Sequence, residues 1–131
     1  MISSLYASLL AVIFLILTIK VVKIRKSAKV SIGDAGNLAL QKAIRAQGNF
    51  CESTPIAVIL LILAEASMAS SLILHFCGII FVLGRIFHAI AINSEKEDFR
   101  FRVGGMVLSL TSIILLILLN LSFYFSSFSG A

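Results

Sequence analysis

The sequence predicts an all-α integral membrane protein, a bundle of four transmembrane helices in a single domain over residues 1–131. Apolar residues make up 60% of the chain and its mean hydropathy is +1.09, which is more apolar surface than a soluble domain of this length could bury. The apolar runs are long and do not alternate with polar residues, which excludes a transmembrane β-barrel. Charged residues form 13% of the chain and cluster between these runs, as loops between membrane helices do.

The first predicted helix runs from about residue 2 to 22, close to the ~20 residues that cross a bilayer. No Lys or Arg precedes its apolar run and no small-residue cleavage site follows it, so we expect a retained membrane helix and not a signal peptide. Cations follow the run at Lys20, Lys23, Arg25, Lys26 and Lys29. This pattern places the end of the helix on the cytoplasmic side.

The second predicted helix covers residues 37–66, after a turn formed by Gly33-Asp34-Ala35-Gly36. Its first half is polar, and its second half is an apolar run that begins at Pro55. The apolar half alone is too short to cross a bilayer. The helix spans only if its polar half lies within the membrane or directly above it.

The third and fourth predicted helices cover residues 72–92 and 103–125. A short neutral link precedes the third, and a charged loop containing Glu95-Lys96-Glu97-Asp98 precedes the fourth. With four spans, both charged loops share the cytoplasmic side and both termini lie on the other side. Glu65 and His75 fall near that other surface, where we expect solvent or headgroups to contact them.

A polar stripe crosses the second helix. Lys42, Arg45, Asn49 and Glu52 share one helix face within roughly 80°. Charges near a bilayer are costly, so they require a partner, a polar cavity or a ligand. One interpretation is that Arg45 and Glu52 form salt bridges between helices that hold an oligomer together. The other is that the stripe binds a ligand.

Two segments carry a family resemblance. Residues 45–55 fit the pattern R-A-x-x-N-x-x-E-x-x-P, and a second match consists of residues 84–88 with residues 100–106. Together they resemble the signature of the MAPEG family, the membrane-associated proteins in eicosanoid and glutathione metabolism. The resemblance covers nearly the whole chain and is closest to bacterial members, which indicates a bacterial inner membrane protein.

The resemblance implies a homotrimer that binds glutathione, as co-substrate, between neighbouring protomers. Arg45, Asn49 and Glu52 would contact glutathione, with Gln47 close by. Their chemistry agrees: Arg45 can bind a carboxylate through two hydrogen bonds, Glu52 can pair with the ammonium, and Asn49 can bond to the peptide groups. The full binding set that we predict is Lys42, Arg45, Gln47, Asn49, Glu52, Arg85 and His88.

An arginine at the start of the fourth helix would face the glutathione sulfur. Arg102 aligns best, and Arg100 is the alternative. A guanidinium lowers the pKa of a nearby thiol, and a fall from ~8.5 to ~6.5 would leave it mostly ionised at neutral pH. Arg85 lies deep in the third helix and needs a partner, for which Glu52 is a candidate. His88 is either a ligand contact or a hydrogen-bonded core residue.

We therefore predict a glutathione-dependent membrane enzyme that conjugates lipophilic electrophiles or reduces lipid hydroperoxides. Ser53 stands where leukotriene-forming members carry a tyrosine, so the thiol would depend on arginine alone. The alternative is a non-catalytic binding or scaffold protein on the same fold. The sequence shows no metal-binding spacing, and anionic lipid headgroups explain the basic cluster after the first helix better than nucleic acid does. The two cysteines, Cys51 and Cys77, are expected to be apolar packing residues.

Overall fold

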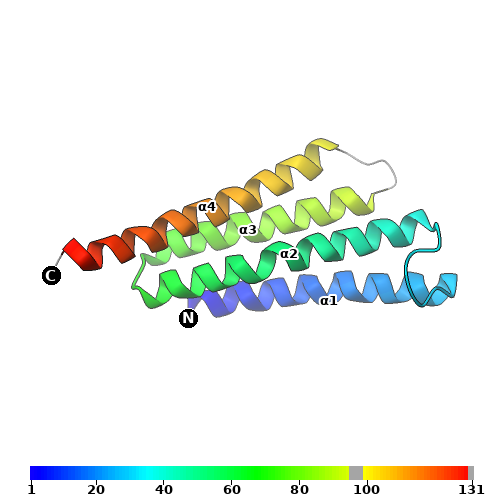
Figure 1. The fold of residues 1–131 in the computed structure, drawn as a ribbon, viewed down its shortest axis with the longest axis horizontal. Helices are drawn as coiled ribbons and strands as arrows, with labels where there is room; N and C mark the ends of the chain where they lie inside the picture. Colours follow the sequence, from blue (N-terminus) through cyan, green and yellow to red (C-terminus); the bar gives the residue numbers. More distant parts are fainter. Residues whose placement is uncertain (95–98, 130–131) are drawn as a thin grey trace.

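The protein is a bundle of four antiparallel helices (Figure 1). The computed structural model describes residues 1–94 and 99–129, and this part of the chain contains helices and no strands. Each helix is long and apolar enough to cross a membrane, so the protein is a multi-pass membrane protein. The helices are α1 (Ile2–Ala28), α2 (Leu38–Ala66), α3 (Ser71–Asn93) and α4 (Phe99–Ser129).

Helices α1 and α4 are longer than predicted by several residues, and α3 by one residue at each end. Helix α1 ends at Ala28 and not at residue 22, because Lys and Arg are good helix formers and their charges favour a helix C-terminus. Lys29 then ends it in the left-handed conformation, with φ of 54°. Helix α4 begins at Phe99 and not at residue 103, so both candidate thiol arginines lie within the helix. The predicted charged loop at residues 95–98 lies outside the described residues.

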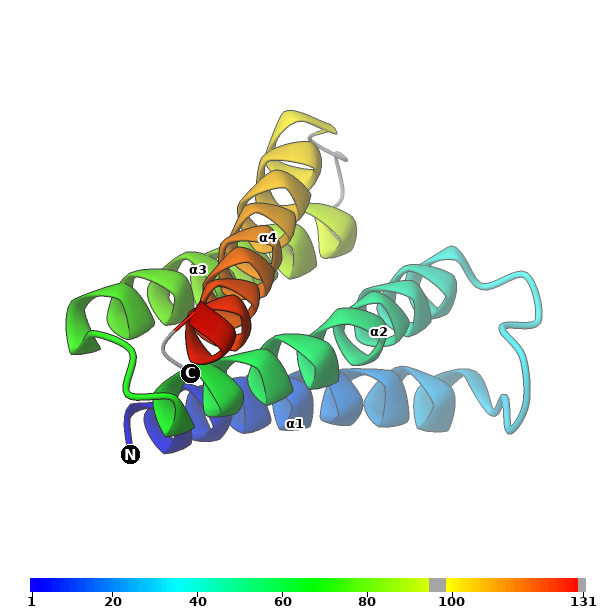
Figure 2. The ribbon, with the colours of Figure 1, turned by 60° about the vertical axis from the view of Figure 1, so that its left-hand side comes forward.

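Helices α2 and α3 form the centre of the bundle. Each of them contacts all three other helices, whereas α1 and α4 make no contact with each other. In Figure 1, α1 and α4 form the two outer edges of the bundle, and Figure 2 shows α4 crossing in front of α3. Helix α2 begins at an N-cap, where the side chain of Asn37 accepts a hydrogen bond from the backbone N–H of Leu40 at 3.0 Å. It continues as a helix through Pro55.

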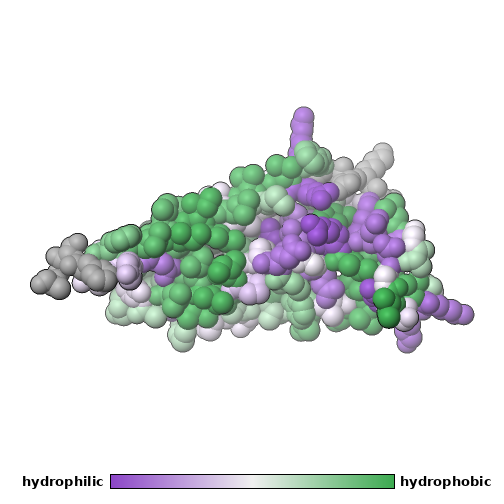
Figure 3. All heavy atoms as spheres, in the orientation of Figure 1, coloured by the Kyte–Doolittle hydropathy of each residue, from purple (hydrophilic) through white to green (hydrophobic). Residues whose placement is uncertain are grey.

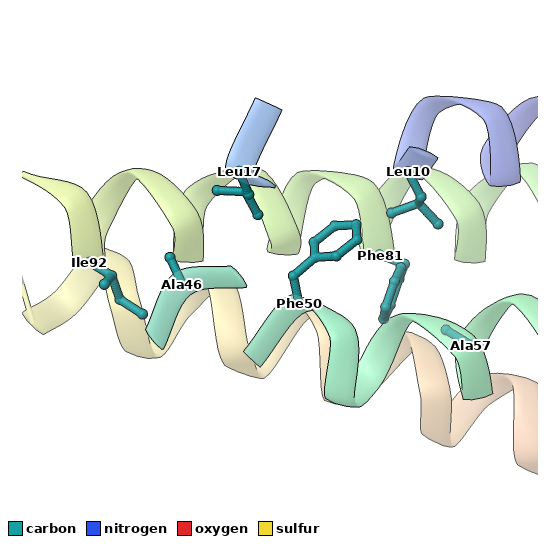
Figure 4. Packing of buried hydrophobic residues seen from close by; sticks show 7 residues of the cluster. All are labelled: Leu10, Leu17, Ala46, Phe50, Ala57, Phe81 and Ile92. Carbon is teal, nitrogen blue, oxygen red and sulfur yellow. The ribbon is translucent and has the colours of Figure 1, made fainter. Parts of the chain in front are cut away.

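The main apolar core joins α1, α2 and α3. Figure 4 shows this cluster, with the rings of Phe50 and Phe81 in its middle. Small residues on α2, such as Ala46 and Ala57, let the neighbouring helices approach these rings. Burial is confined to such seams, and large apolar side chains elsewhere on the helices are exposed, as a membrane environment allows.

Helices α3 and α4 pack backbone to backbone. A Cβ atom added to Gly105 would lie 2.6 Å from the backbone nitrogen of His88 and 2.7 Å from the backbone oxygen of Gly84. Further along, the Ser112 hydroxyl donates to the backbone oxygen of Cys77 at 2.8 Å. Glycine and serine at a helix crossing are typical of membrane bundles, because they permit close approach and interhelical hydrogen bonds.

The two ends of the bundle differ in polarity. We call the end with the 29–37 connection the loop end, and the end with both termini the terminal end. Figure 3 shows hydrophilic side chains gathered over the half of the molecule towards the loop end, while the other half is hydrophobic. The candidate site lies in the polar half.

Polar residues at the terminal end have protein partners. The Glu65 carboxylate accepts hydrogen bonds from the backbone N–H groups of Ile2 and Ser3, the latter at 2.9 Å. Nδ1 of His75 lies 2.8 Å from the hydroxyl of Tyr6. Glu65 and His75, which are both partly exposed, therefore also bind protein groups at this surface. The carboxylate joins the end of α2 to the start of α1, where unpaired N–H groups attract negative charge.

Candidate functional site

The centre of the site is a buried arginine that bridges three helices. Arg85 of α3 is 3% exposed. Its Nη1 donates to Oδ1 of Asn49 at 2.7 Å and to the Ser53 hydroxyl at 2.9 Å, both on α2. Its Nε donates to the Ser109 hydroxyl of α4 at 2.9 Å. The predicted partner Glu52 is wrong: the side chains that bind Arg85 in the described part of the chain are neutral.

This arrangement fixes the orientation of Asn49. Because its Oδ1 accepts from Arg85, its amide N–H groups must point elsewhere and remain able to donate. The Ser53 hydroxyl is both an acceptor and a donor. It accepts a hydrogen bond from Arg85 and donates one to the backbone oxygen of Asn49 at 3.1 Å. Because the described side chains that bind Arg85 are neutral, its positive charge is not cancelled by them and makes this region attractive to anions.

Sequence reasoning missed Ser53 and Ser109 as the residues that hold Arg85. Their positions in the sequence could have indicated this role. Ser53 lies one helical turn after Asn49 on the same face, and Ser109 lies one turn after Gly105, at the tight crossing of α3 and α4. Short hydroxyl side chains at a close helix crossing are well placed to satisfy a buried cation.

The stability of this network can be tested at Asn49. We expect Asn49→Ala to lower the free energy of unfolding by about 1.5–3 kcal/mol, the usual contribution of a hydrogen bond to a charged group. Asn49→Asp should retain most of that stability, because a carboxylate also accepts from Arg85. Unfolding by denaturant in mixed micelles measures both variants. Equal stability of the alanine variant and the wild type would contradict the structural role of this bond.

The outward half of the polar stripe is an exposed ion pair. Arg45 Nη1 lies 3.7 Å from Glu52 Oε1, and the two side chains are 61% and 62% exposed. The pair lies within α2, so it does not link helices of one protomer. Both side chains are well placed to change partners, because a single exposed contact of this length contributes little to stability.

Two further predicted residues bind groups on other helices. Lys42 donates from Nζ to the backbone oxygen of Ser94 at the end of α3, at 3.1 Å. Gln47 turns towards α1, where its Nε2 donates to the Thr18 hydroxyl at 2.8 Å. The structure thus brings together Arg45, Asn49 and Glu52, and places Gln47 away from them.

His88 lies where three helices contribute positive charge. It is 3% exposed, and the charges of Arg45, Arg85 and Arg102 all act on it. Arg102 therefore comes towards the same region as the stripe. Arg100 is two positions earlier, about 200° around the helix, and it lines a separate cavity with Phe87 and Phe101. The two arginines therefore leave α4 on different sides.

An apolar cavity of about 450 Å³ lies between α1 and α2, and no residue of the stripe lines it. Cys51, which is exposed, and Thr54 line it. The Thr54 hydroxyl is buried and has no hydrogen-bond partner among the described residues. The prediction that both cysteines pack in apolar contacts holds for Cys77, which is buried. The cavity is lined by Ala7, Leu10, Ala11, Phe14, Phe50, Cys51, Thr54, Pro55, Val58 and Ile59.

Comparison with known proteins identifies relatives of this chain. The model of the MAPEG family matches residues 3–122. The inner membrane protein YecN of Escherichia coli strain K12 is 36% identical over 121 residues, which cover 92% of this chain and 91% of that protein. The protein of the same name from E. coli strain CFT073 matches to the same extent.

Proposed function

The chain belongs to the MAPEG family, and on that premise we propose that it is a bacterial inner membrane protein that binds glutathione and activates its thiol. The observation that carries the proposal is the exposed Arg45–Glu52 pair beside the buried Arg85–Asn49 bond. Glutathione has two carboxylates, one ammonium group and two peptide links. These match a guanidinium, a carboxylate and an amide with available N–H donors.

The site is half of a larger one. Arg45 and Glu52 are exposed in a single protomer, and charges uncovered in a bilayer are costly. We infer that a second copy of the chain covers this face and that the assembly is the homotrimer that the family resemblance implies. The outer faces of α1 and α4, which do not contact each other within one protomer, are available for such packing.

The reaction that this site would support begins at the glutathione sulfur. Arg102, which acts on the same region as Arg85, would stabilise the thiolate. In conjugation, the sulfur attacks an electrophilic carbon of a lipophilic substrate and a halide or similar group leaves. In peroxide reduction, two glutathione molecules form a disulfide and supply the two electrons that convert the hydroperoxide to an alcohol and water. The lipophilic partner would enter from the bilayer along apolar side chains between protomers.

Titration of detergent-solubilised protein with glutathione tests the binding step. We expect Arg45→Ala to weaken binding at least tenfold, since hydrogen bonds between charged groups contribute about 1.5–3 kcal/mol. Lys26→Ala is the matched control, because it removes an exposed cation from α1 outside the site. Light scattering confirms that each variant keeps its oligomeric state. Equal affinity in the wild type and Arg45→Ala would refute the site.

A non-catalytic binding protein is the second candidate. The observation that favours it is Ser53, whose hydroxyl is occupied by Arg85 and by the backbone oxygen of Asn49. The Ser53 hydroxyl is therefore not available to donate a hydrogen bond to a bound thiol and activate it. Turnover with a chromogenic aryl halide separates the two candidates. Binding of glutathione without turnover of the halide or of a lipid hydroperoxide would support the binding protein over the enzyme.

A further inference from the structure

A second polar pocket lies at the loop end, between the ends of α1, α2 and α3. Its volume is about 380 Å³, within the range of small-molecule sites. Lys42, which the sequence grouped with the glutathione-binding set, lines it, but Arg45, Asn49 and Glu52 do not. We call it the lysine pocket, and it is lined by Lys20, Ile24, Leu38, Ala39, Lys42, Asn93 and Ser94.

The lysine pocket is positively charged. Lys20 of α1 and Lys42 of α2 are both half-buried in it, and none of the lining residues in the described ranges 1–94 and 99–129 is acidic. Lys42 uses one ammonium proton on the backbone oxygen of Ser94, which leaves two to donate. Asp34, in the neighbouring connection, turns its Oδ1 to the backbone N–H of Gly36 at 2.9 Å. Two half-buried ammonium groups, with no carboxylate among the described residues that line the pocket, favour the binding of an anion.

The depth of the pocket matches the surface of a bilayer. Residues 2–19 of α1 carry no charge, and Lys20 is the first cation. Lys20 lies about 27 Å along the helix from Ile2, at 1.5 Å per residue, and a hydrocarbon core is about 30 Å thick. The ammonium groups therefore lie at the level of lipid phosphates. The apolar side chains of Ile24 and Leu38 form the remaining wall, where the first methylene groups of an acyl chain can pack.

We propose that the lysine pocket binds the phosphate of an anionic phospholipid. Lys20 and Lys42 bind the phosphate oxygens, and the acyl chains extend along the outside of the bundle from Ile24 and Leu38. A bound lipid would join the ends of α1, α2 and α3 at the end of the bundle that also carries the polar stripe. This proposal does not depend on the proposed glutathione chemistry.

Native mass spectrometry of the full chain in detergent, titrated with phosphatidylglycerol, tests the proposal. We expect Lys20→Gln to weaken binding about fivefold, and Lys20→Gln with Lys42→Gln about 25-fold. Lys20→Arg should bind like the wild type because it keeps the charge. The matched control is Lys26→Gln with Lys29→Gln, which removes two exposed cations of the same loop end and should leave affinity within about twofold.

Three results would contradict the binding of an anionic phospholipid in the lysine pocket. Equal losses in the pocket and control variants would show general attraction to basic residues and overturn it. Tighter binding of inorganic phosphate than of phosphatidylglycerol would assign the pocket to a soluble anion and also overturn it. Binding of zwitterionic phosphatidylcholine with the affinity of phosphatidylglycerol would show that the pocket does not select an anionic lipid, and would overturn the proposal. Glutathione titration of Lys20→Gln should match the wild type, which separates this pocket from the glutathione site.

Discussion

Replacing Arg102 by glutamine is expected to raise the pKa of the bound glutathione thiol from about 6.5 towards about 8.5, because an adjacent positive charge lowers a thiol pKa by 1–3 units. At neutral pH the thiolate fraction would then fall about 25-fold. The sign is fixed by the charge: the guanidinium favours the thiolate, so its loss favours the protonated thiol. Turnover should fall at pH 7 and recover as the pH rises above the new pKa.

The thiolate absorbs in the ultraviolet, so a pH titration of the bound complex measures this pKa directly. Arg100→Gln is the matched variant, since it removes the same charge from the same helix on a different side. We expect it to leave the pKa of the bound thiol unchanged. A shift of the thiol pKa in Arg100→Gln and none in Arg102→Gln would assign thiolate stabilisation to Arg100. No shift of the pKa in either variant would show that neither arginine stabilises the thiolate.

Replacing Gly105 by valine is expected to lower the free energy of unfolding by about 3 kcal/mol, the upper part of the range for overpacked sites. The new Cβ would lie 2.6 Å from the backbone nitrogen of His88 and 2.7 Å from the backbone oxygen of Gly84. Both are backbone atoms and cannot rotate away. Helices α3 and α4 would have to separate, which would also draw Ser109 away from Arg85.

Gly104→Val is the control for this substitution. A Cβ at Gly104 meets nothing within 4 Å, although the residue is next in the chain and has the same helical environment. Denaturant unfolding in mixed micelles should find Gly104→Val close to the wild type. Similar losses for both variants would mean that helix propensity, and not the crossing of α3 and α4, explains the effect.

The helices themselves could be predicted from the sequence, because transmembrane segments depend on local hydrophobicity and length. The differences between the predictions and the structure concern the ends of helices and the hydrogen-bond partners of polar side chains. Helix α1 continues to Ala28 through a basic stretch whose charge suggested a loop, although such residues are good helix formers. Glu65 was expected to face solvent, but it accepts hydrogen bonds from the first residues of α1, which are 62 and 63 positions away.

The sequence predicted which residues of the candidate site share a helix face, but not which partners their side chains reach. The spacing of Arg45, Asn49 and Glu52 on one helix face follows from helical periodicity. Periodicity does not say which neighbouring helix a side chain reaches, and for that reason the partner of Arg85 was misassigned to Glu52. Gln47 was placed near the stripe by the family resemblance alone. It lies about 200° around the helix from Arg45, and its amide donates to Thr18 of α1.

The sequence by itself determined that this is a four-span membrane protein with a polar stripe on its second helix, since both features depend on residue type and spacing along the chain. Only the tertiary structure decided how the stripe divides. Asn49 turns inwards to a buried Arg85, Lys42 turns to the end of α3, and Arg45 and Glu52 remain exposed. Side chains within one helical face diverge when different helices pack on either side, and that packing depends on contacts between residues far apart in the chain.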